Sequence, residues 1–320
     1  MTWWMADGRR ASVDTVNDSA RVLCDWGSTR LRAFLEVGGV VSDRRDGPGV
    51  AVSGEPPARI LASVLAPWRA GHRLGRVFLC GMAGSRNGLA EVPYVRAPAE
   101  VQAWRRGARR ALAGDLEASV AAGIETENFH GAPDVMRGEE TQIFGALRLD
   151  RQLARGCRLI VLPGTHSKWV LVREAHIVRF QTCLTGELFD LLCRHSSLLR
   201  AGAGAGLEAG EEGFEAGLSA AARGELVASL FETRAAQLVG GRTSGWARAF
   251  LSGLLIGAEV TSMVRVLEAV AGEVTVIGEP ALAAFYLRAL ANRGITAHAL
   301  DGDRCVLAGL REFAVADEGG

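Results

Sequence analysis

Apolar and polar positions follow one another in short blocks that predict the strands, turns and helices of an α/β protein. Residues 21–24, apolar after Arg21, lead into a polar tip at residues 25–29. Residues 31–37 then predict a second strand, and the Gly38-Gly39 turn leads into a third strand that begins at Val40. A helix is predicted over residues 59–70 and a short buried strand over residues 77–80. This part of the chain is therefore expected to form a β-meander, a helix and a further strand.

The same order of elements returns later in the chain. Residues 159–162 and 169–172 predict strands on either side of a polar tip, and another strand begins at Ile177. Further helices are predicted over residues 100–113, 139–149, 247–269 and 281–291. Gly253 and Gly257 are four residues apart within the longest of these helices. Because residues at that spacing lie on one helix face, we expect close packing there.

The two meanders are related by a constant spacing. Gly27 and Gly164 are 137 residues apart, as are Val40 and Ile177, and residues 33–35 match residues 170–172 at the same spacing. Residues 76–81 and 273–278 form a second match, 197 residues apart, in which each short apolar strand ends at a glycine. Internal similarity of this kind predicts a duplicated fold. The larger second spacing predicts an insertion in the second half that includes residues 201–213.

Composition narrows the classes of function. A chain of 320 residues fits two domains of about 150 residues each. The 36 basic and 36 acidic residues cancel, so charge gives no reason to expect nucleic acid or a membrane surface as a partner. We find no apolar run of the roughly 18–20 residues that a membrane span needs, and the scattered cysteines indicate a reducing compartment. We therefore expect a cytoplasmic protein, with residues 1–20 forming an irregular tail.

The first polar tip has the residue types of a phosphate site. Asp25 can hold Mg²⁺, Gly27 allows the backbone to approach a phosphate, and Ser28 and Thr29 can donate to phosphate oxygens. Ordinary turns favour the same residue types, so this tip alone does not separate a turn from a phosphate site.

The second polar tip has a similar character. It offers Gly164, Thr165 and His166, and it is followed by Lys168, which is the single lysine of a chain otherwise rich in arginine. Lys168 is either a contact for phosphate or an acidic substrate, or an exposed residue beside the hairpin. Two such tips, one in each half, suggest that a triphosphate is held from both sides of a cleft.

A third segment offers carboxylates. Asp134 precedes the predicted helix at residues 139–149, and Glu139 and Glu140 begin it. A carboxylate near the attacking hydroxyl assists phosphoryl transfer to an alcohol. Acidic residues at a helix start are also favoured by capping and by the helix dipole. The three carboxylates are therefore candidates for a catalytic base, with an ordinary capping role as the alternative.

Six segments together resemble the 2-dehydro-3-deoxygalactonokinase family of the actin/hexokinase/Hsp70 superfamily of ATP-binding folds. They are DWGSTRLR (25–32), CGMAGSRNG (80–88), EVPY (91–94), RGEETQ (137–142), LPGTHSKW (162–169) and IGEPAL (277–282). The LPGTHSKW string is the most specific of them. The resemblance implies an α/β fold with two ribonuclease-H-like lobes, each a mixed β-sheet flanked by helices, and an ATP cleft between them. The lobes are expected at residues 21–138 and 139–320.

The resemblance further implies ATP-dependent phosphorylation, with Mg²⁺, of 2-dehydro-3-deoxy-D-galactonate at its terminal C6 hydroxyl, in galactonate catabolism. The first tip falls on the family's first phosphate motif and the second tip on its second. Gly278 falls on the adenosine-side motif. More distant kinases often use aspartate as the base where this sequence has Glu139 and Glu140, which leaves the identity of the base open.

The implied substrate is a small sugar acid, and arginine is the natural clamp for a carboxylate because its fork pairs with both oxygens. Arg30, Arg86 and Arg137 lie within or beside the motif segments and are the candidates, with ordinary surface arginines as the alternative. Two other functions remain open, an exopolyphosphatase-like phosphohydrolase of the same superfamily and a non-catalytic sugar-acid sensor. A homodimer is also left open.

Overall fold

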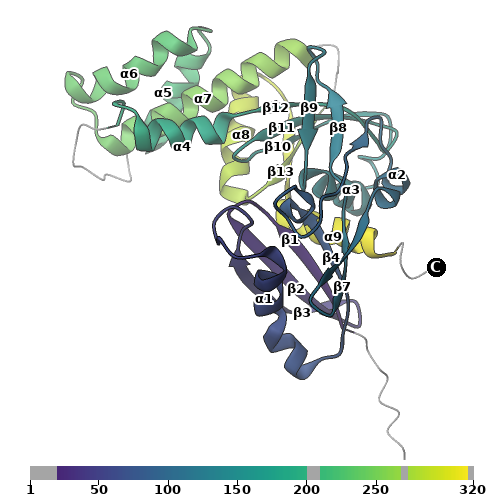
Figure 1. Cartoon of the computed structure of the whole chain (residues 1–320). Coiled ribbons are helices and arrows are strands. Elements are labelled where there is room, and N and C mark those ends of the chain that lie inside the picture. Colours follow the sequence, from purple (N-terminus) through teal and green to yellow (C-terminus); the bar gives the residue numbers. More distant parts are fainter. Residues whose placement is uncertain (1–19, 200–209, 268–272, 316–320) are drawn as a thin grey trace, which may run out of the picture.

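The computed structural model describes residues 20–199, 210–267 and 273–315 (Figure 1). Two large β-sheets lie one above the other in Figure 1, with helices on their faces. Four helices extend from the upper sheet as an arm; they are α4 (Thr185–His195), α5 (Gly210–Ala221), α6 (Leu226–Leu238) and α7 (Ser244–Leu267). Residues 1–19 of the predicted tail and residues 201–209 of the predicted insertion lie outside the described residues.

The first sheet has the strand order β3-β2-β1-β4-β7-β6. The strands β1, β2 and β3 form the predicted antiparallel meander, and β4 and β7 continue the sheet in parallel from β1. Helix α1 (Pro57–Gly71) covers the sheet with a buried apolar stripe that includes Leu61 and Leu65. The strands are β1 (Ala20–Trp26), β2 (Arg30–Val37), β3 (Val40–Pro48), β4 (Leu74–Gly81), β6 (Arg109–Ala113) and β7 (Leu116–Val120).

The second sheet repeats this order as β12-β11-β10-β13-β14. Its first three strands form an antiparallel meander, and β13 and β14 continue in parallel from β10. The predicted duplication is confirmed, including the match of residues 76–81 with 273–278: the first lie in β4, and residues 274–278 of the second form β13. The strands are β10 (Cys157–Leu162), β11 (Ser167–Arg173), β12 (His176–Cys183), β13 (Val274–Gly278) and β14 (Ala297–Asp301).

The spacing between the repeats differs from the prediction in the second and third strands, where it is 136 residues. Asp25 of β1 faces Arg32, seven residues further on, whereas its counterpart Leu162 of β10 faces Lys168, six residues further on. The second tip is therefore one residue shorter than the first. Residues 33–35 correspond to residues 169–171, and residue 40 to residue 176. This correction matters because a slip of one residue exchanges the two faces of a strand.

The helix predicted over residues 100–113 is wrong in its second part. Helix α2 (Val101–Arg106) ends at Gly107, and the following residues form β6, which pairs antiparallel with β7 at the sheet edge. The buried Trp104 fixes the end of α2 by donating from Nε1 to the carbonyl of Ala122 at 2.8 Å. Pairing with β7 therefore overrides the helical pattern of the local sequence. A small third sheet follows, formed by β5 (Val95–Arg96), β8 (Ile124–Glu127) and β9 (Pro133–Met136).

Helix α7 corrects the expectation that no segment could span a membrane. By length and composition alone, residues 244–266 could cross a membrane, although 61% of the most apolar window in this helix is buried within the protein. A Cβ atom at Gly253 would lie 2.1 Å from the carbonyl oxygen of Phe214, and one at Gly257 would lie 2.7 Å from Cβ of Ala221. The close packing predicted for these glycines is confirmed, because α5 lies directly against them. Helix α7 is therefore the core helix of the arm.

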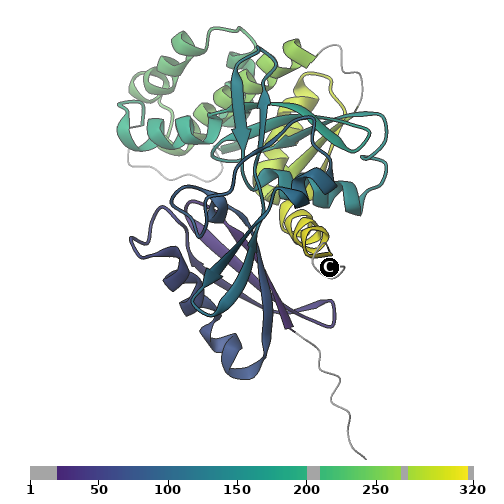
Figure 2. The same cartoon turned by 45° about the vertical axis from the view of Figure 1, so that its right-hand side comes forward.

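Two helices pack on each other between the sheets. They are α3 (Glu139–Leu149), found at the predicted bounds, and α9 (Gly302–Ala314), drawn in yellow in Figure 2. A Cβ at Gly145 would lie 1.8 Å from the carbonyl oxygen of Cys305, and one at Gly309 would lie 1.9 Å from that of Thr141. The two backbones therefore touch, which only glycine permits. The division into lobes at residue 138 stays a prediction.

Candidate active site

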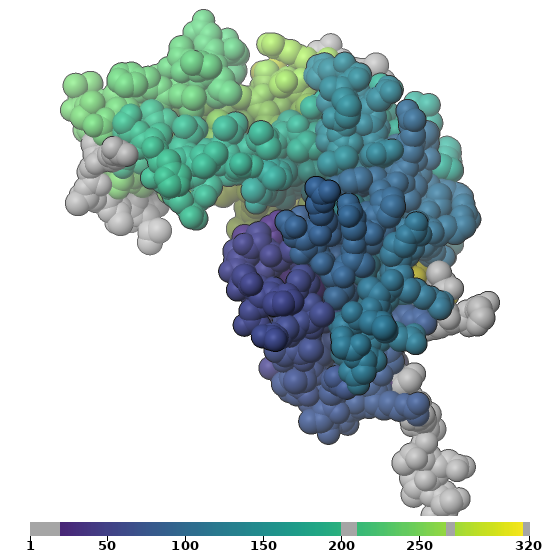
Figure 3. All heavy atoms as spheres, viewed as in Figure 1, coloured from purple at the N-terminus to yellow at the C-terminus, as the bar shows by residue number. Residues whose placement is uncertain are grey.

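A cavity of about 390 Å³ opens where the two halves meet. The molecule is visibly hollowed between the arm and the first half (Figure 3). The first tip, the end of β13 and the start of α9 form most of its wall, and Gln142 of α3 completes it. Predicted site residues on its wall are Asp25, Gly27, Thr29, Arg30 and Gly278; the remaining lining residues are Arg32, Gln142, Pro163, Ile277, Glu279, Pro280, Asp301, Gly302 and Asp303.

Asp25 lies at the end of β1 with its carboxylate held from two sides. Arg32, directly opposite on β2, donates from Nη2 to Oδ2. The thiol of Cys80 lies 3.7 Å from Oδ1. Arg32 also pairs with Asp303 at the start of α9. Beside the predicted phosphate tip, Arg32 of β2 therefore links acidic residues from the two halves.

Two glycines bring the start of α3 against this tip. Gly81, at the end of β4, has φ of 75°, and a Cβ there would lie 2.7 Å from the carbonyl oxygen of Trp26. Gly138, which caps α3, has φ of 114°, and its Cβ would lie 3.2 Å from Cα of Gly81. Both conformations favour glycine. The acidic residues at the start of α3 are thus stacked on the strand ends beside Asp25.

Glu140 is fully buried, and its carboxylate is hydrogen-bonded within the start of α3. Its Oε2 accepts from the backbone N–H of Gly138 at 2.7 Å, and its Oε1 accepts from the hydroxyl of Thr141 at 3.2 Å. Burial, assisted by the charge of Glu139, raises the pKa of Glu140 to about 8. Glu140 therefore mostly holds its proton at neutral pH.

The raised pKa of Glu140 gives a testable stability effect. The folded state retains a proton that the unfolded chain releases near pH 4.5, so the free energy of unfolding falls as pH rises from about 4.5 to about 8. Glu140→Gln keeps the shape but cannot ionise. In urea titrations at pH 5 and pH 8, we expect the wild type to lose about 2–4 kcal/mol more stability than Glu140→Gln does. Equal losses in the two proteins would contradict the assignment.

Glu139, by contrast, has a partly accessible carboxylate paired with Lys168. The Nζ of Lys168 lies 3.2 Å from Oε1 of Glu139 and donates to the carbonyl of His166 at 3.2 Å. The backbone N–H of Arg137 donates to the other carboxylate oxygen of Glu139 at 3.1 Å. Lys168 is 3% exposed, so the alternative of an exposed residue beside the hairpin is wrong. The ammonium orients Glu139 and ties α3 to the second tip.

Lys168→Arg is expected to lower kcat/KM by about 10–100-fold. A planar guanidinium is wider than an ammonium, so in this enclosed position it would displace Glu139, and small misplacements near the chemistry are costly. Arg173→Lys, on an exposed residue of the same strand, serves as the control and should keep full activity. Steady-state kinetics with matched thermal unfolding test this. A fully active Lys168→Arg enzyme would mean that the surviving lysine has no special role.

The second tip lies against the start of α4. A Cβ at Gly186 would lie 2.3 Å from the carbonyl oxygen of Gly164, and the N–H of Glu187 donates to the carbonyl of Thr165 at 2.9 Å. The exposed His166 contacts the carboxylate of Glu187 through Nε2 at 2.5 Å. The tip and the first turn of α4 therefore form one unit.

A buried carboxylate that sequence reasoning missed anchors this unit. Glu259 of α7 accepts from the hydroxyl of Ser167 at 2.9 Å, from Nε1 of Trp169 at 2.7 Å and from the hydroxyl of Tyr286 at 2.8 Å. Burial raises the pKa of Glu259, and its hydrogen-bond donors oppose that rise. The position of Glu259 in the middle of a long apolar helix is the sequence signal that could have identified it.

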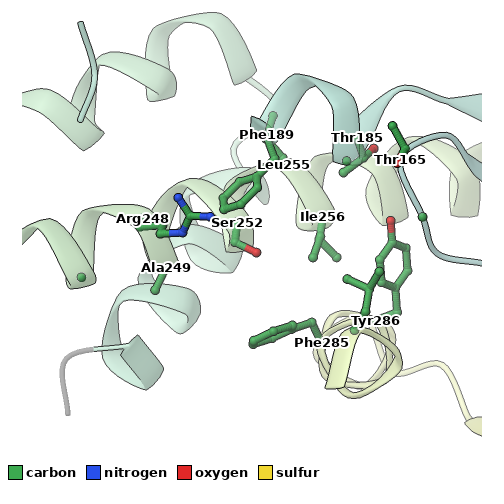
Figure 4. A pocket seen from close by; sticks show the side chains of 14 residues that line it. Thr165, Thr185, Phe189, Arg248, Ala249, Ser252, Leu255, Ile256, Phe285 and Tyr286 are labelled. Atoms are coloured by element: carbon green, nitrogen blue, oxygen red, sulfur yellow. The ribbon is translucent and has the colours of Figure 1, made fainter. Parts of the chain in front are cut away.

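A second, mostly apolar cavity of about 540 Å³ adjoins the second tip (Figure 4). It lies between α4, α7 and α8 (Pro280–Asn292), and Thr165 forms part of its wall. The side chains of Phe189, Ile256 and Phe285 face into it, with the hydroxyl of Ser252 and the guanidinium of Arg248 at its edge (Figure 4). Sequence reasoning missed these residues because they come from helices separated by many residues.

The remaining candidate residues from the sequence are Asp134, Arg137, Ser28 and Arg86. Asp134 of β9 accepts from the N–H and hydroxyl of Thr182 at 2.7 and 2.6 Å, so it joins β9 to β12. Arg137 stacks on Tyr94, with Cζ 4.3 Å from the ring centre, and donates to a backbone carbonyl. Its Nε and Nη1 are buried without a partner among the described residues. Ser28 and Arg86 are exposed, and neither lines the two cavities described above.

The two halves share one strand order, each has a phosphate-type tip, and a carboxylate-bearing helix lies between them, an arrangement that suits a phosphoryl-transferring enzyme. A family model described as 2-keto-3-deoxy-galactonokinase matches residues 25–313, and the chain belongs to this family.

Full-length relatives agree with this assignment. The 2-dehydro-3-deoxygalactonokinase of Escherichia coli (strain K12) is 37% identical over 302 residues, covering 92% of this chain and 97% of the relative. DgoK1 of Rhizobium meliloti (strain 1021), described as the same type of kinase, is 36% identical over 299 residues, covering 91% and 95%. A crystal structure from Sinorhizobium meliloti, also described as such a kinase, has a TM-score of 0.80 and 33% identity, covering 94% of this chain and all of that chain.

Proposed function

We propose that this kinase transfers the γ-phosphoryl group of ATP to the C6 hydroxyl of 2-dehydro-3-deoxy-D-galactonate. The observation that supports this best is that Lys168, which follows the second tip, pairs with the partly accessible Glu139 at the start of α3, while Gly138 at the same helix start contacts Gly81 beside the first tip. Phosphoryl transfer needs mainly positioning and charge stabilisation. The family assignment favours this function over the exopolyphosphatase-like and sensor alternatives.

The two cavities suit the two ends of ATP. The apolar cavity beside α7 and α8 offers aromatic and aliphatic walls for the adenine. The polar cavity beside Asp25 and Gly278 offers backbone and hydroxyl donors for phosphates. They adjoin at residues 163–165 and at the start of α8. A nucleotide lying across the second tip would therefore reach from one cavity to the other.

The wall of the polar cavity also suits Mg²⁺. This ion binds one or two carboxylates and completes its shell with water and phosphate oxygens. Asp25 supplies a carboxylate on the cavity wall and is the residue that would hold it. Bound there, Mg²⁺ would neutralise phosphate charge. Gly27 and Thr29 would then orient the phosphates through backbone and hydroxyl donors.

Glu139 is the proposed base. It accepts the proton of the C6 hydroxyl while that oxygen forms a bond to the γ-phosphorus, and the bond to ADP breaks with its electron pair. Lys168 keeps the carboxylate oriented. Asp134, engaged with Thr182, is better suited to holding β9 in place. Among the predicted clamps for the substrate carboxylate, Arg137 has buried N–H groups without a partner among the described residues and lies next to the start of α3.

A coupled kinase assay over a panel of 2-keto-3-deoxy sugar acids tests the proposal. The galactonate derivative should give the highest kcat/KM, and product analysis should place the phosphate on C6. Equal rates with sugar acids that lack a C6 hydroxyl would refute the assigned acceptor. We retain the cytoplasm as the predicted compartment, and a homodimer stays a prediction for sedimentation analysis.

A further inference from the structure

The duplication extends to the two helices between the sheets. Gly138 caps the start of α3 and contacts the glycine that ends β4; Gly302 is the first residue of α9 and contacts Gly278, which ends β13. In each case a Cβ would lie 3.2 Å from Cα of the strand glycine. Seven residues further on, Gly145 and Gly309 form the mutual backbone contact of the two helices. The helices α3 and α9 are therefore equivalent, with a spacing of 164 residues.

The equivalence of α3 and α9 places two acidic residues at corresponding positions. Glu139 and Asp303 each directly follow the glycine at the start of its helix. Glu139 pairs with Lys168, and Asp303 pairs with Arg32. Lys168 and Arg32 are also equivalent, since each faces the last residues of the first strand in its own repeat. Each hairpin therefore binds, through one cation, the helix start that belongs to the other repeat.

The ion pair of Lys168 with Glu139 and that of Arg32 with Asp303 differ in one respect. The counterpart of Asp25 is the apolar Leu162, so Lys168 has no acid opposite it on the neighbouring strand. Arg32, in contrast, contacts Asp25 and Asp303 together. Its side chain is 14% exposed and that of Asp303 is 46% exposed. Burial lowers the pKa of Arg32, but the neighbouring acids Asp25 and Asp303 outweigh this, so the net shift is upward.

We propose that Asp303 is a positioning residue for the phosphate site, acting through Arg32 to fix the carboxylate of Asp25. A guanidinium held by one acid alone can turn about its flexible stem, whereas one held on both sides keeps a single orientation. Asp303 comes from the start of α9, so it also makes the geometry of Asp25 depend on the contact between the two halves. This inference rests on the proposed function, in which Asp25 lies beside the phosphates.

The test uses Asp303→Asn, which removes the charge but keeps the shape. We expect about a tenfold weaker binding of MgADP by calorimetry and about a tenfold higher KM for ATP, with the KM for the sugar acid unchanged. Asp303→Glu should restore most of both, because the equivalent position already uses glutamate. Asp115→Asn is the matched control: Asp115 is exposed, pairs with Arg69 and lines neither cavity. This control should leave both values unchanged.

The possible results distinguish the positioning role of Asp303 from the proposed function. Asp303→Asn with unchanged MgADP binding and unchanged KM for ATP, in an active preparation, would overturn the positioning role. Equal increases in the KM of both substrates, or a loss of thermal stability with no selective effect on the nucleotide, would also overturn it. A wild-type protein that binds MgADP but phosphorylates no sugar acid would refute the proposed function, and the calorimetric comparison would still decide the role of Asp303.

Discussion

Asp25→Asn is expected to lower kcat/KM for ATP by about 10³-fold while the protein stays folded. Asp25 brings a negative charge to the wall of the polar cavity, and the asparagine amide cannot replace it as a ligand for the Mg²⁺ that accompanies ATP. The amide oxygen can still accept a hydrogen bond from Arg32, so the hairpin should keep its shape. Steady-state kinetics and circular dichroism of the purified variant measure both effects.

A suitable control for this experiment is Asp115→Asn. Its side chain is 72% exposed and pairs only with the surface residue Arg69 among the interactions described. It should retain normal kinetics, which would show that loss of one acid in the first half is harmless in general. Near-normal turnover of Asp25→Asn would remove Asp25 from the phosphate site.

Glu139→Gln is expected to lower kcat by about 10²–10⁴-fold, the usual contribution of a general base. The KM for ATP should change little, because Glu139 acts on the acceptor hydroxyl. Glu140→Gln is the informative comparison, since that acid already holds its proton at neutral pH. It should retain most of the activity at pH 7.

The reverse ranking of these two variants would contradict the assignment of the base. If Glu140→Gln were inactive and Glu139→Gln active, the buried acid would have to reach the substrate through a rearrangement that opens the start of α3. Lys168→Arg adds an independent check, because its effect should disappear when Glu139 is already glutamine.

The hairpins and the duplication could be predicted from sequence because they depend on local patterns. Alternating apolar positions and glycine-containing turns identified both meanders, and the acidic helix was found at its observed bounds, Glu139–Leu149. The length of the second tip could not be predicted to one residue, since strand register depends on pairing between strands. The edge strand β6 was missed for a related reason, because its partner β7 decides its conformation.

The candidate site was predictable to a similar degree. Residues within motifs, such as Asp25 and Gly278, lie on the wall of one cavity. The sequence could not separate Glu139 from Glu140, because adjacent acids have the same local signals and differ only in burial. Arg32 and Asp303 are 271 residues apart, so only the packing of α9 against the first half brings them together.

ADP release with and without 2-dehydro-3-deoxy-D-galactonate, measured in one preparation of the wild-type protein, tests the central claim most directly. We expect ADP release to depend on the sugar acid, with one phosphate recovered on C6 for each ADP formed. Hydrolysis of ATP at the full rate without the sugar acid would contradict a kinase and indicate water as the acceptor.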